Sequence, residues 1–151
     1  MFPEAHAIWR GGLYAGEGVV STPSGVLNNA TYAFGSLAGT ERFTTPYEML
    51  AAAIASCMST MVALEMAKLG INPTVVGTYA VLNLDNSADI WPITSAHLEI
   101  TARTTGASDA ESSRFEQAVE SARRECPISS ALKLQLTCKA KVISLASTAF
   151  V

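Results

Sequence analysis

The feature that most constrains the fold is a segment of 16 residues, MLAAAIASCMSTMVAL, from Met49 to Leu64. It contains no charged residue, and Glu48 and Glu65 stand on either side of it. A membrane-spanning helix needs about 20 apolar residues, whereas this segment is shorter and includes three hydroxyl side chains. We therefore expect a helix buried in protein, with no membrane partner.

A helix that is apolar nearly all round must be covered on most of its sides. A single domain of ordinary size rarely covers a helix so completely by itself. The segment therefore favours a partner subunit, and its many alanine and serine side chains would let neighbouring helices approach closely.

The limits of this helix can be read from the residues around it. Thr45 suits the N-cap, Pro46 suits the first helical position, and Glu48 completes a capping box. The helix should run to about Lys68, and Gly70 should end it.

The rest of the chain alternates between strand and helix signals. Residues 5–43 have glycine, proline and asparagine turns between short apolar pieces, without a helical period. Strands are expected over 75–85, 93–104 and about 134–143, a second helix from Ser108 with a capping box to Glu111, and a short helix after Cys126. This order predicts an α+β fold, a single domain over residues 1–151 with a mainly antiparallel sheet.

Composition excludes several classes of protein. Of the 151 residues, 49% are apolar and 15% charged, which indicates a globular chain, and the net charge of −3 gives no sign of a nucleic-acid partner. The first ten residues show no secretory signal. We therefore expect a cytoplasmic protein, in which cysteines serve catalysis or redox chemistry more often than they form structural disulfides.

The three cysteines differ in their surroundings. Cys138 lies on the apolar face of the last strand and should pack as a small hydrophobic residue. Cys57 lies in mid-helix on a stripe with Leu50, Ala53, Ile54, Met61 and Leu64, so that either core packing or reactivity is open. If Cys57 is reactive, its thiolate needs a nearby cation, because an ordinary thiol with a pKa near 8.5 is mostly protonated at neutral pH.

Cys126 stands directly before Pro127, at a break between two helices. The residue before a proline is kept out of helical geometry, and proline suits the first position of a new helix. Cys126 should therefore be an N-cap, where unpaired backbone N–H groups favour a thiolate. The adjacent Arg123 and Arg124 fit the solvated end of the preceding helix.

A metal site is a further possibility that the sequence raises. Cys57, Cys126, His6 and His97 could supply ligands, but no close Cys/His spacing joins them. We expect no metal.

Two motifs together carry a family resemblance. TPYEMLAAAIASCMSTMVALEMAKLG is followed, 69 positions after Cys57, by CPISSAL, and GEGVVSTPSGVLNNATYAF lies near the N-terminus. Over about residues 5–145 this pattern resembles the OsmC/Ohr family of organic hydroperoxide reductases, in particular the OsmC-like branch. The resemblance implies an OsmC-like fold in which two subunits intertwine around the buried central helices.

The resemblance also implies a function. Cys57 would be the peroxidatic cysteine, which reduces an organic hydroperoxide to an alcohol and becomes a sulfenic acid. Cys126 would be the resolving cysteine, which forms a disulfide with Cys57, and an external dithiol of the lipoyl type would restore both thiols. No metal, flavin or haem cofactor is implied.

The family's two helper residues have no direct counterparts. The arginine that holds the thiolate aligns with Leu37, so that Arg42, or alternatively Arg10, would take its role. The glutamate that orients the arginine aligns with Tyr47, so that Glu48, one position later, is the candidate for its role. Two alternatives therefore stay open: a dimer of this fold that acts in binding or stress with weak or no peroxidase activity, and a different thiol chemistry on the same fold.

Overall fold

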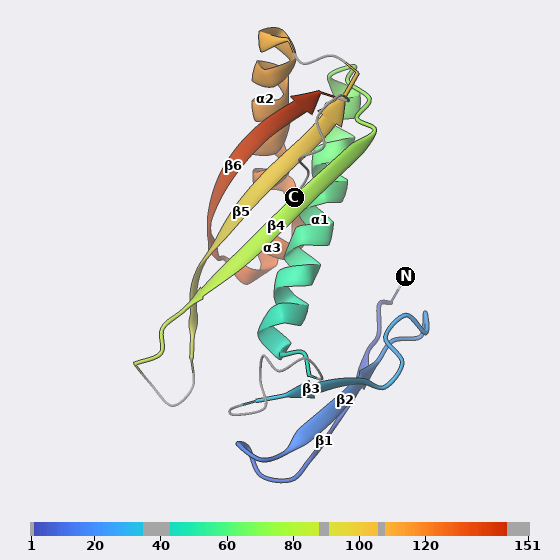
Figure 1. Ribbon diagram of the computed structural model, residues 1–151, viewed down its shortest axis with the longest axis vertical. Helices are drawn as coiled ribbons and strands as arrows, with labels where there is room; N and C mark the ends of the chain where they lie inside the picture. Colours follow the sequence, from blue (N-terminus) through green and yellow to red (C-terminus); the bar gives the residue numbers. More distant parts are fainter. Residues whose placement is uncertain (1, 35–42, 88–90, 106–107, 145–151) are drawn as a thin grey trace. The chain divides into compact units, whose positions relative to one another are not determined.

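The computed structural model describes residues 2–34, 43–87, 91–105 and 108–144, and the chain divides into two compact units, Met1–Leu50 and Ala51–Val151 (Figure 1). The first unit holds β1 (His6–Arg10), β2 (Glu17–Ser21), β3 (Ala30–Ala33) and the first residues of α1 (Pro46–Lys68). The second holds the rest of α1 with β4 (Val75–Leu84), β5 (Ile93–Thr104), α2 (Asp109–Glu125), α3 (Pro127–Leu132) and β6 (Gln135–Ser144). The expectation of a single domain over the whole chain stays a prediction.

The first unit is an antiparallel meander in the order β1-β2-β3. Gly18 pairs with Tyr32 across the sheet, and a Cβ atom at Gly18 would lie 2.3 Å from the Tyr32 ring. The ring therefore lies over the glycine, in the close approach for which strands use this residue. The Trp9 ring packs beside it, with the two ring centroids 5.6 Å apart.

The second unit contains a separate three-stranded sheet in the order β4-β5-β6 (Figure 1). β4 and β5 are antiparallel, whereas β5 and β6 are parallel. The α+β class is confirmed, but the strands form two sheets where one was expected, and β5 and β6 pair in parallel. The reason is that α2 and α3 form the crossover between β5 and β6, which a parallel pair requires.

Helix α1 begins and ends where its local sequence predicts. Thr45 and Glu48 form the capping box: the Glu48 N–H donates to Thr45 Oγ1 over 3.1 Å, and the Thr45 N–H donates to Glu48 Oε2 over 2.8 Å. At the other end the N–H groups of Ile71 and Gly70 donate to the carbonyls of Met66 and Ala67. This is a Schellman motif, in which Gly70 takes the left-handed conformation with φ +73°.

One stripe of α1 is buried, and it is not quite the stripe expected. The buried residues are Ile54, Met58, Val62, Glu65 and Met66. Ser59 ties this helix to the sheet, since its hydroxyl donates to Thr78 Oγ1 of β4 over 2.8 Å. Leu64, which was expected on the core stripe, is 49% exposed. The prediction was wrong there because α1 uses the neighbouring i, i+4 row against the sheet.

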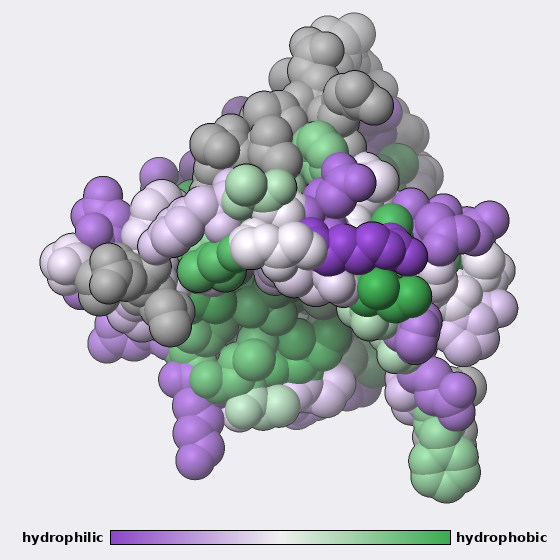
Figure 2. Space-filling view, turned by 90° about the horizontal axis from the view of Figure 1, so that it is seen from below, coloured by the Kyte–Doolittle hydropathy of each residue, from purple (hydrophilic) through white to green (hydrophobic). Residues whose placement is uncertain are grey.

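Within the described residues, α1 is therefore covered on one side. By length and hydropathy alone α1 could span a membrane, a test that the core helix of a soluble protein also passes. Hydrophobic residues also reach the surface elsewhere, and Figure 2 shows a face of the molecule on which they gather. The apolar residues of α1 that the sheet does not cover are the remaining evidence for a partner subunit.

The core of the second unit lies between one face of the sheet and the helices. Alternate residues of β5, from Ala96 to Thr104, are buried on this face. Helix α2 adds the stripe that its spacing predicts, Phe115, Ala118, Val119 and Ala122, all buried. Ser108 and Glu111 form the expected capping box at the start of α2. Cys138 pairs with Leu98 and so shares this face, where it is half-buried.

Candidate functional site

The sulfur atoms of Cys57 and Cys126 lie 2.9 Å apart, although 69 positions separate the two residues. Cys57 comes from the middle of α1, and Cys126 from the junction between α2 and α3 (Figure 1). Both are free thiols in this structure. A disulfide bond is about 2.05 Å long, so that the two sulfurs would need to approach by about 0.9 Å to form one.

Cys57 is half-buried beside the buried stripe of α1. Burial raises the pKa of the Cys57 thiol, and its hydrogen bond with Cys126 raises this pKa further, while the backbone of Ile128 acts in the opposite direction. Among the described residues of the second unit, no arginine or lysine contributes to this shift. The cation that a Cys57 thiolate needs is therefore not supplied by this part of the structure.

Cys126 is fully buried and stands at the N-cap of α3, with Pro127 at the first helical position, as the sequence predicts. Burial raises the pKa of the Cys126 thiol, but hydrogen bonds to its sulfur outweigh burial and leave the pKa below its usual value. The Cys57 thiol and the Ser129 hydroxyl lie within hydrogen-bond distance of this sulfur, and the nearby backbone of Ser129 and Ile128 lowers the pKa further. These contacts favour the charged form of the Cys126 sulfur.

Ser129 is the residue of this site that sequence reasoning missed. It is 4% exposed, and its hydroxyl donates to the Cys126 sulfur over 3.3 Å. The signal was present in the sequence, because Ser129 is the third residue of a helix whose N-cap is Cys126. Side chains at these two positions face each other, as they do in a capping box.

Glu48 lies in the first turn of α1, and its carboxylate is occupied by the helix cap. Oε2 accepts from the Thr45 N–H and, over 3.0 Å, from the Thr44 hydroxyl. These contacts explain the presence of Glu48 by its role in capping α1. A catalytic part for it stays a prediction.

The two candidate arginines are not brought to the cysteine pair by any described contact. Arg42 lies outside the described residues. Arg10 is exposed at the end of β1, in the first unit, while the cysteine pair belongs to the second. The identity of the arginine that would support Cys57 stays a prediction.

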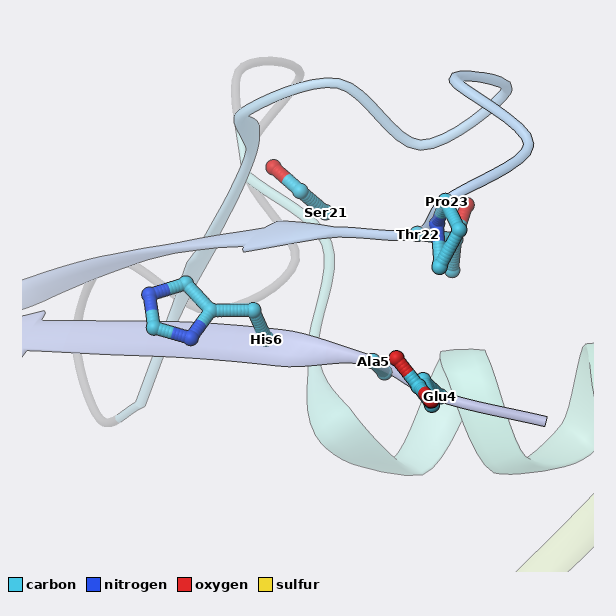
Figure 3. A pocket seen from close by; sticks show the side chains of 6 residues that line it. All are labelled: Glu4, Ala5, His6, Ser21, Thr22 and Pro23. Carbon is cyan, nitrogen blue, oxygen red and sulfur yellow. The ribbon is translucent and has the colours of Figure 1, made fainter. Parts of the chain in front are cut away.

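The possible metal ligands named from the sequence do not form a cluster among the described residues. No group of three or more histidine, cysteine, aspartate or glutamate side chains is placed to hold an ion there. His97 lies on the other face of β5, where Nδ1 is 2.7 Å from Thr137 Oγ1. His6 lines a surface pocket of about 410 Å³ with Glu4, Ala5, Ser21, Thr22 and Pro23 (Figure 3). Neither cysteine of the pair is among these lining residues.

The third cysteine has a different environment. Burial raises the pKa of the Cys138 thiol, with Arg123 lowering it and Glu120 raising it to smaller extents. Cys138 has no second sulfur within hydrogen-bond reach among the described residues. This supports the expectation that Cys138 packs as a small hydrophobic residue.

Comparisons with known proteins show the family of this chain. The chain is 34% identical over 134 residues to peroxiredoxin OsmC of Escherichia coli, an alignment that covers 89% of this chain and 92% of the relative. Among solved structures, an OsmC-like protein of unknown function from Vibrio cholerae superposes with a TM-score of 0.76 at 15% identity, covering 93% of this chain and 99% of the other.

The organic hydroperoxide resistance protein OhrB of Bacillus subtilis superposes with a TM-score of 0.61 at 22% identity, covering 93% and 98% of the two chains. At these identities the structures show a shared fold. The family model described as OsmC-like protein matches residues 39–141, which include both cysteines of the pair. The chain belongs to the OsmC-like protein family.

Proposed function

We propose that this protein is a thiol-dependent peroxidase that reduces organic hydroperoxides to alcohols. The observation that carries the proposal is the 2.9 Å separation of the Cys57 and Cys126 sulfurs on two different helices. A packing role alone would not require two of the three cysteines of the chain to meet. The similarity to a protein named peroxiredoxin OsmC supports the same activity.

In the proposed first step the Cys57 sulfur, as a thiolate, attacks the terminal oxygen of the hydroperoxide. The O–O bond breaks, the alkoxide leaves and takes a proton to become the alcohol, and Cys57 holds a sulfenic acid. The substrate is reduced by two electrons and the sulfur is oxidised by two. Cys57 fits this step because it is the more accessible of the two sulfurs.

In the second step the Cys126 thiolate attacks the Cys57 sulfur. The S–S bond forms, the S–O bond breaks, and hydroxide leaves and becomes water. The short distance between the sulfurs favours this step, because α1 and α3 need not unfold to bring them together. The buried N-cap position of Cys126 also keeps its sulfur away from a second peroxide molecule.

The cycle closes when an external dithiol exchanges with the disulfide and releases both thiols. A dithiol of the lipoyl type fits this requirement, because its two sulfurs can reduce the bond without a second reductant. The proposed cycle uses no bound cofactor and no metal. It begins from reduced thiols, the state that a reducing cytoplasm maintains.

The uncovered side of α1 supports a homodimer as the working form. A second copy could cover these apolar residues with its own α1. The role predicted for Arg42 is to supply the cation that stabilises the Cys57 thiolate in the first step. A part for Glu48 in that step stays a prediction.

The test is a thiol count and peptide map after one equivalent of cumene hydroperoxide is added to the reduced protein. We expect a Cys57–Cys126 disulfide, a free Cys138 and an equivalent amount of cumyl alcohol. If all three thiols survive and no alcohol forms, the peroxidase proposal fails. The fold would then serve binding or another thiol chemistry.

A further inference from the structure

The Ser129 hydroxyl is almost completely buried and points at one sulfur. Ser129 is 4% exposed, and the Cys126 sulfur, 3.3 Å from Oγ, is the partner of its hydroxyl. Buried hydroxyl groups in proteins are hydrogen-bonded with few exceptions. The contact is therefore part of the site's construction. Ser130, the next residue, is exposed and donates instead to the Arg124 carbonyl over 3.4 Å.

Cys126 has need of such a donor, because burial by itself penalises a charged sulfur. The charged residues that precede it do not compensate for burial. The side chains of Arg124 and Glu125 are 63% and 58% exposed and engage partners on α2 and α1. Among the described residues, the titratable group in contact with the Cys126 sulfur is the Cys57 thiol, and the neutral Ser129 hydroxyl of α3 donates to it.

We propose that Ser129 is a positioning residue of the cysteine pair. Its hydroxyl holds the Cys126 sulfur within 2.9 Å of Cys57 and favours the charged form of the Cys126 sulfur, because it donates to that sulfur. The kinetic consequences rest on the proposed peroxidase function, whereas the ionisation of the thiols does not.

In the second step of the proposed cycle the Cys126 thiolate attacks the Cys57 sulfenic acid, the S–S bond forms and hydroxide leaves. A donor that favours the charged form of Cys126 should speed this step, because the thiolate and not the thiol is the nucleophile.

Three variants test the role of Ser129 in the full chain, each in a Cys138→Ser background that removes the third thiol. Ser129→Ala removes the hydroxyl, Ser129→Thr keeps it, and Ser130→Ala is the matched control on the same helix. The ultraviolet absorbance of thiolate is followed against pH in the reduced proteins. Circular dichroism and thermal unfolding establish that each variant is folded.

We expect Ser129→Ala to move the first ionisation to higher pH, with about tenfold less thiolate at a fixed pH below the midpoint, because a hydrogen bond to a charged group contributes about that factor. Ser129→Thr should restore the ionisation, and Ser130→Ala should leave it unchanged. An unchanged midpoint in folded Ser129→Ala overturns the inference, as does an equal shift in Ser130→Ala.

A second measurement separates this inference from the proposed function. The rate of Cys57–Cys126 disulfide formation with cumene hydroperoxide should fall in Ser129→Ala and recover as the pH is raised. If the wild-type protein forms no disulfide but Ser129→Ala still shifts the ionisation, the proposed function fails and the role of Ser129 stands. If wild-type and Ser129→Ala form the disulfide at the same rate at every pH, the role of Ser129 fails and the peroxidase stands.

Discussion

The sulfur of Cys126 lies 2.9 Å from that of Cys57, and hydrogen bonds to the buried Cys126 lower its pKa. At the half-buried Cys57, burial and the contact with Cys126 raise the pKa. This division would serve the proposed peroxidase, because the substrate reaches the accessible sulfur while the buried sulfur ionises more readily. The predictions below follow from it and from the surfaces that the fold leaves uncovered.

The two cysteines should fail in different ways when they are replaced. Cys57→Ser should reduce peroxide consumption to the uncatalysed background, because a serine hydroxyl does not replace the attacking thiolate. Cys126→Ser should allow one slow turnover and then accumulate sulfenic or overoxidised Cys57, which trapping reagents and mass spectrometry would identify. Cys138→Ser is the control and should turn over normally. Full multiple turnover by Cys57→Ser would sink the assignment of roles.

The thiols of the pair should ionise in two well-separated steps. The pKa of Cys126 is lowered by its hydrogen bonds, so that one proton should leave below the ordinary thiol range near 8.5. The pKa of Cys57 is raised by burial and by Cys126, so that the second proton should leave above that range. Thiolate absorbance of reduced Cys138→Ser measures both steps. Loss of two protons together at an ordinary thiol pKa would contradict the arrangement.

Local rules were sufficient to predict the parts of the fold that depend on a few neighbouring residues. The start of α1 at Thr45 and its end at Gly70 follow from a capping box and a left-handed glycine. The N-cap position of Cys126 follows from Pro127. In each case the deciding interaction lies within six positions of the residue, which is the range that sequence patterns report.

Contacts between distant segments could not be predicted in this way. The parallel pairing of β6 with β5 depends on where α2 and α3 return the chain, and no residue of β6 itself encodes it. The choice of the Ile54–Met58–Val62 row over the row of Leu64 depends on the sheet that α1 meets. The meeting of Cys57 and Cys126 was implied only by the family resemblance, and their distance needed coordinates.

Glu48 should prove to be a capping residue. Thr45→Ala should cost about 1 kcal/mol of unfolding free energy, because it removes the N-cap acceptor. Glu48→Gln keeps an oxygen for the Thr45 N–H and should cost no more than about 0.5 kcal/mol, since it loses only the charge at the helix N-terminus. Denaturant unfolding measures both, and peroxide consumption by the two folded variants should match that of the wild type. Loss of activity in stable Glu48→Gln would instead assign the carboxylate to the chemistry.

The uncovered side of α1 should be the place where two copies meet. Leu64 is 49% exposed on this helix, so that a partner could bury about half of this residue, which contributes roughly 0.8–1.5 kcal/mol per copy. Leu64→Lys should therefore weaken association at least about tenfold, because each copy loses this burial and would have to bury an unpaired charge. Sedimentation over a range of concentrations measures the change.

Val26→Lys is the matched control, since Val26 is 85% exposed in the loop between β2 and β3, away from α1 in sequence, and the substitution adds the same charge. It should leave the association unchanged. A wild-type protein that stays monomeric at all concentrations would overturn the dimer. If both substitutions weaken the dimer equally, the added charge explains the loss. The apolar side of α1 would then not be the interface.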